Sequence, residues 1–418
     1  MNSKCRYIAA VAVVLVLCAY VMTIIAGCGQ KSTGGEIVIW EQKDPEEQII
    51  LNRQLEAFTE KHPDLVISTV HFETDVLHSQ FQTAALAGGG PDLVYGPSDK
   101  VGPYSVMALI RPLEDQFDRA FLDEFEKGSV PVLDGHVYAI PDQIGNHLML
   151  IYNRALVDRA PRDSDEWIGM CAAATRDLDD NGFPDQFGLV FNYMEPFWLV
   201  PFLGGFGGWV MDTENRPTLD TPAMVQALRF LADLRNRHKV IPKECNYELS
   251  DTMFKQGRAA FLINGPWSLK AYVNAGLDIG VTPIPMIAAT GMHPTPMVSS
   301  KGYSISVNVP EKKLPLVREL LVYLTSEEAQ RDIMTELLIL PSRSTLFRDP
   351  ALQENPILAG SLAQARLGSQ MPDVPEMRAV WDAIRPFYQS VLGGQMEPEA
   401  AAREMQQRAV KKIAEMKQ

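Results

Sequence analysis

The amino-acid sequence predicts an α/β protein whose sheet is mainly parallel. Three short apolar segments, 36–40, 65–70 and 91–95, are each typical of a strand. Between them lie two segments whose apolar residues recur at helical spacing, the first starting at Asp44 and the second ending at three consecutive glycines. Strands that alternate with helices favour βαβ units, and therefore parallel pairing.

The same kinds of element continue along the chain. Residues 134–141 contain the turn formers of a hairpin, and residues 148–152 follow as an apolar strand. A helix that ends at Gly257 leads into another apolar strand, 259–263, which breaks at three turn formers in a row. Trp267 comes directly after this break, just past a strand end, where open α/β sheets place their ligands.

Composition limits the class of protein. A chain of 418 residues with 46% hydrophobic and 22% charged residues is long enough for two or three globular domains. The net charge of −14, without a run of basic residues, argues against nucleic-acid binding. Beyond Cys28, which stands at the end of the N-terminal leader, the only cysteines are Cys171 and Cys245, which form either one disulfide or two buried thiols.

The N-terminus has the layout of a secretory signal. Lys4 and Arg6 precede an almost wholly apolar stretch, 7–26, and the stretch ends at Ala-Gly-Cys28. This ending resembles the bacterial lipobox, which implies a lipoprotein signal peptide over 1–27, a lipidated Cys28 and a polar tether over 28–35. The alternative is an uncleaved membrane anchor, because roughly 20 apolar residues can span a bilayer. Both alternatives place the folded body outside the cytoplasm.

Three motifs resemble one known family. They are Asn-Gly-Pro-Trp at 264–267, Gly-x-x-Tyr-Ala-x-Pro at 135–141, and Met-Pro-x-x-Pro-x-Met-x-x-x-Trp-x-x-x-Arg at 371–385. The chain from about residue 37 onward resembles the extracellular solute-binding proteins of carbohydrate ABC transporters, of the maltose/maltodextrin-binding type. This resemblance implies a monomeric binding protein without a cofactor, which closes on a sugar and presents it to two membrane permease subunits.

The resemblance also implies a two-lobed periplasmic-binding-protein-like fold with a hinge between the lobes. The N-terminal lobe is expected to comprise residues 36–143 and 297–340, and the C-terminal lobe residues 144–296 and 341–418. Two lobes joined by several crossings close around a ligand by bending at the hinge.

The candidate ligand-binding residues combine aromatic faces with polar groups. An indole such as that of Trp267 can lie flat on the apolar face of a sugar ring, although an ordinary core tryptophan is the alternative. Carboxylates suit sugar hydroxyls because they accept hydrogen bonds strongly, but a carboxylate after a strand can also cap a helix, as Asp44 before Pro45 would. With the roles that the resemblance implies, the candidates are Trp267, Trp381, Phe197, Glu195, Arg385, Asp99, Asp44 and Asn146.

The sequence departs from the family pattern at several sugar-contacting positions. The family's first-lobe aromatic falls at about Gly96, its lysine after the Asp44 position is Pro45, and its glutamate falls in the segment 143–147. Asn146 and His147 are candidates to replace the lost polar contacts. The preferred sugar can therefore differ in linkage or chain length from the maltose-type ligand of the family. The alternative ligands are trehalose, another disaccharide or glycerol phosphate.

Two further classes of function remain as alternatives. A surface glycoside hydrolase would need a pair of carboxylates at catalytic separation, for which Asp99 and Glu195 are candidates. The resemblance instead puts these two residues on opposing lobes as binders. A sensor that hands its closed form to a membrane receptor is not distinguished by the sequence.

One acidic loop has the spacing of a calcium site. Asp177, Asp179, Asn181 and Asp185 stand at loop positions 1, 3, 5 and 9, with Gly182 at position 6. Position 12, where a bidentate glutamate is usual, is Gly188. The loop either holds a structural calcium or is a turn rich in side-chain caps.

Overall fold

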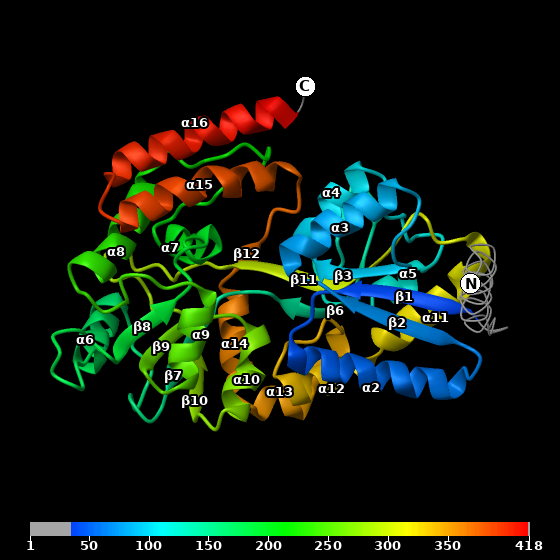
Figure 1. Cartoon of the computed structure of the whole chain (residues 1–418), viewed down its shortest axis with the longest axis horizontal. Helices are drawn as coiled ribbons and strands as arrows, with labels where there is room; N and C mark the ends of the chain where they lie inside the picture. The colour runs from blue at the N-terminus through cyan, green and yellow to red at the C-terminus, as the bar shows by residue number, and fades with distance from the viewer. Residues whose placement is uncertain (1–34, 417–418) are drawn as a thin grey trace, which may run out of the picture.

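The computed structural model describes residues 35–416 and arranges them as two α/β lobes side by side (Figure 1). The predicted signal peptide, Cys28 and nearly all of the tether lie outside the described residues. Within 35–416 no helix is both long and apolar enough to cross a membrane. The predicted two-lobed α/β fold is confirmed.

The sheet of the first lobe has six strands. β1 (Glu36–Glu41) pairs in parallel with β2 (Val66–His71) and β3 (Leu93–Pro97), as the alternating pattern predicted. β11 (Met297–Ile305) pairs antiparallel with both β3 and β6 (Ile140–Gly145), so the complete sheet is mixed. The short β12 (Ser369–Gln370) pairs in parallel with the start of β11.

The sheet of the second lobe has four strands in the order β10 (Ile279–Thr282), β7 (Met149–Asn153), β9 (Ala259–Asn264) and β8 (Phe187–Phe191). Every residue of β9 is buried, because β9 lies inside the sheet and is covered on both faces. Its two neighbours run in opposite directions, β8 parallel and β7 antiparallel.

Helices cover the faces of both sheets (Figure 1). Their apolar sides, with the buried strands, form one large hydrophobic core in the second lobe and three smaller clusters in the first. The helices are α2 (Pro45–Lys61), α3 (Thr74–Leu86), α4 (Val101–Val106), α5 (Arg119–Leu122), α6 (Ser164–Ala174), α7 (Val200–Gly205), α8 (Pro222–Asn236), α9 (Tyr247–Lys255), α10 (Leu269–Asn274), α11 (Leu314–Leu324), α12 (Glu327–Leu337), α13 (Pro350–Glu354), α14 (Pro356–Arg366), α15 (Glu376–Leu392) and α16 (Pro398–Met416).

Short elements complete the chain. The predicted hairpin is formed by β4 (Val132–Leu133) and β5 (His136–Val137). The 3-10 turns are η1 (Ser98–Lys100), η2 (Pro196–Trp198), η3 (Pro266–Ser268), η4 (Glu311–Lys313) and η5 (Ser344–Arg348).

Three segments lie side by side where the chain passes between the lobes. The Ile144 N–H donates to the Leu340 carbonyl at 3.0 Å, and the Asn146 side-chain amide donates to the Ser299 hydroxyl at 3.1 Å. Gly145 (φ 121°) and Asn146 (φ 37°) are both at positive φ, a conformation that glycine and asparagine tolerate best. The predicted residue limits of the lobes stay a prediction.

The two body cysteines are separate buried thiols. Cys171 lies on α6 and Cys245 lies before α9, and neither forms a disulfide. Burial raises the pKa of the Cys171 thiol well above its usual value, and raises the pKa of Cys245 to about 12. Of the two alternatives that the sequence left open, the structure has the buried thiols.

Candidate ligand-binding site

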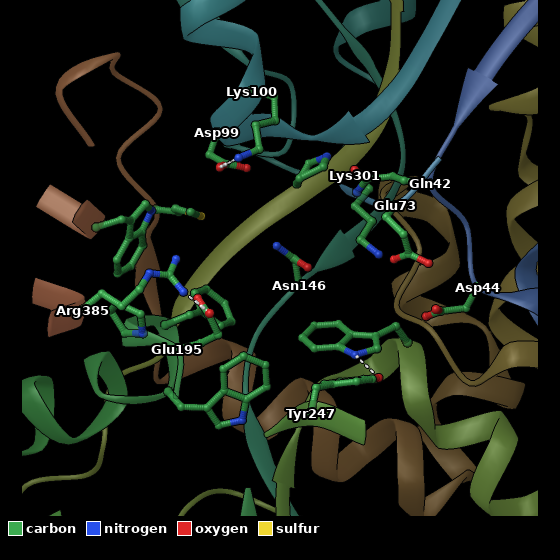
Figure 2. Close-up of a pocket in the computed structure, with 17 residues that line it drawn as sticks. Gln42, Asp44, Glu73, Asp99, Lys100, Asn146, Glu195, Tyr247, Lys301 and Arg385 are labelled. Carbon is green, nitrogen blue, oxygen red and sulfur yellow. Dashed lines mark hydrogen bonds and ion pairs between the residues drawn. The ribbon is translucent and has the colours of Figure 1, made fainter. Parts of the chain in front are cut away.

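A cavity of about 380 Å³ lies between the two lobes, close to the three crossing segments (Figure 2). This volume is within the usual range for sites that take small molecules. All eight residues predicted as ligand contacts line it: Asp44, Asp99, Asn146, Glu195, Phe197, Trp267, Trp381 and Arg385. The structure brings together residues that lie up to 341 positions apart in the sequence, although it does not test whether they contact a ligand.

Aromatic rings form one continuous side of the cavity. The Trp381 ring lies 6.4 Å from that of Phe197, which lies 5.7 Å from that of Trp198, and Trp198 lies 6.4 Å from Tyr247. The Trp267 indole N–H then donates to the Tyr247 hydroxyl at 3.1 Å (Figure 2). Because Trp267, Trp381 and Phe197 are only half-buried and line the cavity, they are not ordinary core residues.

The turn after β9 explains how Trp267 is held. A side chain at Gly265 would place its Cβ only 1.9 Å from the Trp267 ring, so only glycine lets the indole lie against the backbone. Pro266 begins η3, the turn that carries the indole past the strand end. The Asn-Gly-Pro-Trp motif is thus a local fold that presents one aromatic face.

Most charges in the cavity are paired with a neighbour. Arg385 on α15 forms an ion pair with Glu195, which stands just before η2 (Figure 2). Lys100 forms an ion pair with Asp99 at 3.3 Å. Such pairs hold the hydrogen-bonding groups in place and cancel much of the local charge.

Asp44 both begins a helix and lines the cavity. It is the N-cap residue of α2, and its backbone N–H donates to the Glu47 carboxylate at 3.0 Å. Burial raises the pKa of the Asp44 carboxyl to about 6, although the charge of Lys301 acts in the opposite direction. The two interpretations weighed for Asp44 are therefore compatible with each other.

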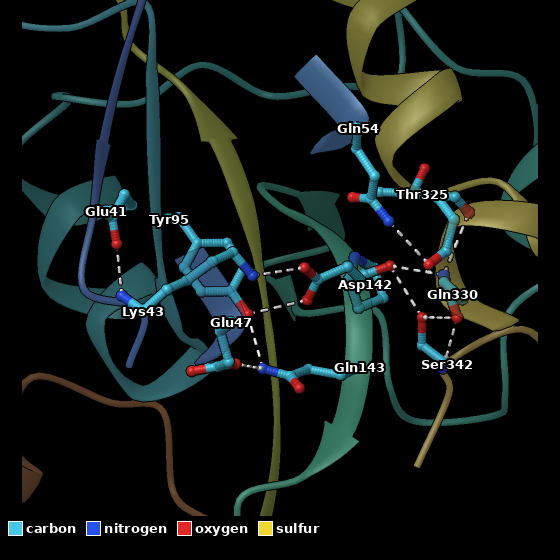
Figure 3. Close-up of polar contacts among 12 residues, drawn as sticks. Glu41, Lys43, Glu47, Gln54, Tyr95, Asp142, Gln143, Thr325, Gln330 and Ser342 are labelled. Atoms are coloured by element: carbon cyan, nitrogen blue, oxygen red, sulfur yellow. Dashed lines mark hydrogen bonds and ion pairs between the residues drawn. The ribbon is translucent and has the colours of Figure 1, made fainter. Parts of the chain in front are cut away.

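A buried polar network lies behind this end of the cavity (Figure 3). Lys43 forms an ion pair with Asp142 at 3.0 Å, and both side chains are almost fully buried. The Tyr95 hydroxyl donates to the second Asp142 oxygen at 3.0 Å, and the Gln143 amide donates to Glu47 at 3.1 Å. Burial alone would raise the pKa of Glu47, but the nearby lysine charges and these hydrogen bonds hold it below its usual value.

His147 does not take the role proposed for it. Its side chain is fully buried, and its Nε2 lies 3.0 Å from the Ser361 carbonyl oxygen. Burial lowers the pKa of His147 to about 4, so the ring is neutral at physiological pH. The hypothesis that His147 supplies a lost polar contact is wrong, whereas Asn146 does line the cavity.

The sequence analysis missed several lining residues, among them Gln42, Glu73, Tyr247 and Lys301. Gln42 lies next to the space above Gly96, where the family pattern has an aromatic ring. One feature of the sequence could have pointed to Lys301, because it is the only charged residue in a nine-residue strand. Glu73 and Tyr247 come from segments without a motif, so only the fold reveals them.

The acidic loop of the second lobe brings its carboxylates together. Oxygens of Asp177, Asp179 and Asp185 lie within 4.8 Å of one another. Backbone N–H groups already donate to Asp177, at 2.7 Å from Gly182 and 3.2 Å from Asn181. These bonds are those of a side-chain-capped turn, and they lower the pKa of Asp177. Calcium binding stays a prediction, which a calcium titration of thermal stability would test.

Comparisons with known proteins agree with this arrangement. A family model described as bacterial extracellular solute-binding protein matches residues 54–360. One similar solved structure is the maltose/maltodextrin-binding domain MalE from Bdellovibrio bacteriovorus bound to maltotriose. It is 40% identical, with a TM-score of 0.87, over 91% of this chain and 100% of that one.

Two curated relatives are more distant. The galactooligosaccharide-binding protein of Bacillus subtilis is 24% identical over 93% of this chain and 94% of its own length. The maltooligosaccharide ABC transporter solute-binding lipoprotein of Streptococcus pneumoniae (strain R6) is 22% identical over 76% of this chain and 75% of its own length.

Proposed function

Because the chain belongs to the bacterial extracellular solute-binding protein family, we propose that it is the substrate-binding protein of a sugar ABC importer. Its ligand is a maltodextrin-like oligosaccharide, which it binds in the cavity between the lobes. The family confirms the expectation of a binding protein rather than an enzyme. The observation that carries the proposal is the continuous aromatic side of the cavity, in a lining that also holds polar groups.

The chemistry of the cavity suits a neutral sugar. Sugar rings have apolar faces that stack on aromatic rings, and hydroxyl groups that need both donors and acceptors. The lining contains four carboxylates against three cations, and two of these cations are paired with carboxylates. A phosphate ligand would require an excess of cations, so glycerol phosphate is disfavoured.

Similarity favours glucose oligomers over other sugars. The relative that is 40% identical was solved with maltotriose, whereas the galactooligosaccharide-binding relative is 24% identical. The maltose-type motifs at 264–267 and 371–385 supply rings that line this cavity. Trehalose and other disaccharides remain useful comparison ligands.

A calorimetric titration of the chain from Lys31 onward tests the ligand. We expect micromolar binding of maltose or maltotriose, and little or no binding of trehalose, sucrose or glycerol-3-phosphate. Trp267→Ala and Trp381→Ala should each abolish measurable binding, because each removes a stacking face. Release of glucose from maltotriose, or no binding of any glucose oligomer, would contradict the proposal.

We propose that Cys28 carries a lipid anchor and that the ligand-loaded protein delivers its sugar to the permease as a monomer. The lipobox-like sequence before Cys28 supports the anchor, and one relative is named a lipoprotein. Cys28→Ser should move the protein from the membrane fraction to the soluble fraction. Co-purification of the wild-type protein with two permease subunits in the presence of maltotriose would support delivery.

A further inference from the structure

Lys301 differs from the other cations at the cavity. Its Nζ lies 5.6 Å from the centre of the Trp267 ring, and its side chain lines the cavity. Lys100 and Arg385 each pair with a carboxylate, whereas among the side chains that the structure describes (35–73 and 76–416) no carboxylate lies within 4.0 Å of the Lys301 ammonium. Its hydrogen-bonding capacity is therefore available to a ligand.

The fold directs Lys301 toward the second lobe. Lys301 belongs to β11 and lies opposite Gln143, while the next residue, Gly302, lies opposite Pro141. The partner strand therefore carries one extra residue, Asp142, at this point, and such a bulge changes the direction of nearby side chains. The Asp142 carboxylate forms its buried ion pair with Lys43 and not with Lys301. The Lys301 side chain therefore lines the cavity instead.

Acidic groups surround the same end of the cavity. Asp44 and Glu73 line it with Lys301, and Figure 2 shows these three residues on the side opposite Glu195 and Arg385. The charge of Lys301 lowers the pKa of both Asp44 and the buried Glu47 from what burial alone would give. One donor-only ammonium thus stands among acceptor-only carboxylates.

We propose that Lys301 determines specificity by donating hydrogen bonds to hydroxyl groups of the sugar unit that lies against Trp267. Asp44 and Glu73 accept hydrogen bonds from hydroxyls of the same unit. Neighbouring hydroxyls fit this arrangement, because each can donate to a carboxylate while accepting from the ammonium. This inference rests on the proposed function, and it names a residue outside the motifs that predicted the site.

The first test compares Lys301→Met with the wild-type protein by calorimetric titration of maltotriose. Methionine keeps most of the side-chain length and removes the charge, so we expect affinity to fall ~10- to 100-fold, as for a lost charge-assisted hydrogen bond. Lys411→Met, on the exposed C-terminal helix α16, removes the same charge away from the cavity and should leave affinity unchanged.

Monodeoxy-maltotriose analogues show whether the effect is direct. At least one analogue should bind the wild-type protein ~10-fold or more weakly than maltotriose, and the penalty for its missing hydroxyl should be clearly smaller in Lys301→Met. A purely structural role for Lys301 would instead leave the full penalty for the missing hydroxyl in the variant. Thermal unfolding of Lys301→Met shows that the variant is folded.

The pH profile of affinity gives a separate measurement. The groups that act on Asp44 are Lys301 from β11, Glu46 and Glu47 from α2, and Glu73 before α3, while Tyr247 on α9 also faces it. We expect wild-type affinity to fall as pH drops through about 6, where Asp44 takes up a proton. In Lys301→Met this fall should begin at higher pH, because the cation that favours ionised Asp44 is gone.

The outcomes separate the two proposals. Maltotriose binding that is equally tight in the wild-type protein and Lys301→Met, with an unchanged pH profile, would overturn the role of Lys301 and leave the proposed function standing. If the wild-type protein binds no glucose oligomer, the proposed function fails and the role of Lys301 fails with it.

Discussion

At the scale of single residues, one or two neighbouring residues fix the positions of aromatic rings at the cavity. Trp267 lies against Gly265, and its indole N–H is held by the Tyr247 hydroxyl. Tyr247 is itself in ring contact with Trp198, whose indole N–H donates to the Ile263 carbonyl at 2.9 Å. The stacking face is thus fixed before a ligand arrives, which reduces the entropy lost on binding.

Tyr247→Phe tests this arrangement. Removing the hydroxyl frees the Trp267 indole to rotate, so affinity for maltotriose should fall about 2- to 10-fold, as for one neutral hydrogen bond. Calorimetric titration measures the effect. Tyr323→Phe, on α11 in the first lobe, is the matched control and should bind as the wild-type protein does. If both variants bound maltotriose as tightly as the wild-type protein, the Tyr247 hydroxyl would not be what holds the Trp267 indole in place.

Asp44→Asn tests the electrostatics of the cavity. The folded-state pKa of Asp44 is raised to about 6, above its usual 3.8, so the folded protein takes up a proton at this group as pH falls from about 6 to 4. Ionised Asp44 therefore reduces stability above pH 6, and this cost disappears toward pH 4. Asparagine caps a helix as well as aspartate does, so the variant should be more stable at pH 7 by about 1–2 kcal/mol after allowance for solvent screening.

Urea unfolding at pH 7 and at pH 4 measures the effect of Asp44→Asn. The gain in the free energy of unfolding should be present at pH 7 and mostly absent at pH 4. A variant that is less stable than the wild-type protein at pH 7 would show that the attraction between ionised Asp44 and Lys301 outweighs the cost of desolvating the carboxylate.

At the scale of elements, the first lobe depends on a polar contact between the end of β1 and β6. The Lys43 ammonium, which follows β1, lies 3.5 Å from the centre of the Tyr95 ring on β3, and it pairs with Asp142 on β6. Burial raises the pKa of Asp142, and the charge of Lys43 offsets part of this shift. The pair connects the crossing strand β6 to the rest of the first sheet.

Lys43→Met should destabilise the protein by about 3–5 kcal/mol, because it leaves a buried carboxylate without its partner. The loss should be smaller at pH 5 than at pH 8, since a protonated Asp142 is less costly to bury. The double variant Lys43→Met/Asp142→Leu should recover part of the stability. Urea unfolding of the three proteins measures these differences, and a double variant as unstable as Lys43→Met would contradict the interpretation.

At the scale of the whole molecule, α4 of the first lobe packs closely on the loop between β12 and α15. A Cβ at Gly102 would lie 1.8 Å from the Asp373 carbonyl oxygen, so this approach requires glycine. The loop contains Met371 and leads to Trp381, and both residues line the cavity. The separation of the lobes is therefore linked to the shape of the ligand site.

Gly102→Ala should hold the lobes further apart. Maltotriose affinity should fall at least tenfold, because part of the binding energy must then be used to close the lobes. With maltotriose present, small-angle scattering should give Gly102→Ala a larger radius of gyration than the wild-type protein. Gly169→Ala, in α6 with open space at its Cβ, is the control and should change neither quantity. Wild-type affinity in Gly102→Ala would mean that the α4 contact does not govern closure.

Much of this protein could be predicted from the sequence, because many of its determinants are local. Apolar runs and turn formers located β1, β3 and β9, and the order of strands and helices gave the parallel pairing of β1 with β2 and β3. The motifs at 264–267 and 371–385, together with polar residues near strand ends, identified eight residues that share one cavity. Each motif fixes its own turn or helix face, so short-range pattern was sufficient.

The tertiary structure alone decided the features that depend on contacts between distant segments. The antiparallel pairing of β11, the burial of His147 and the position of Lys301 over Trp267 all follow from strands that meet at the crossing. Burial and charge environment depend on what the rest of the chain places around a residue, and sequence spacing carries no record of those neighbours. The sequence by itself determined the fold class and three of the rings on the aromatic side of the cavity, those of Trp267, Trp381 and Phe197. The tertiary structure added Trp198 and Tyr247 and decided which cation faces the cavity without a carboxylate partner.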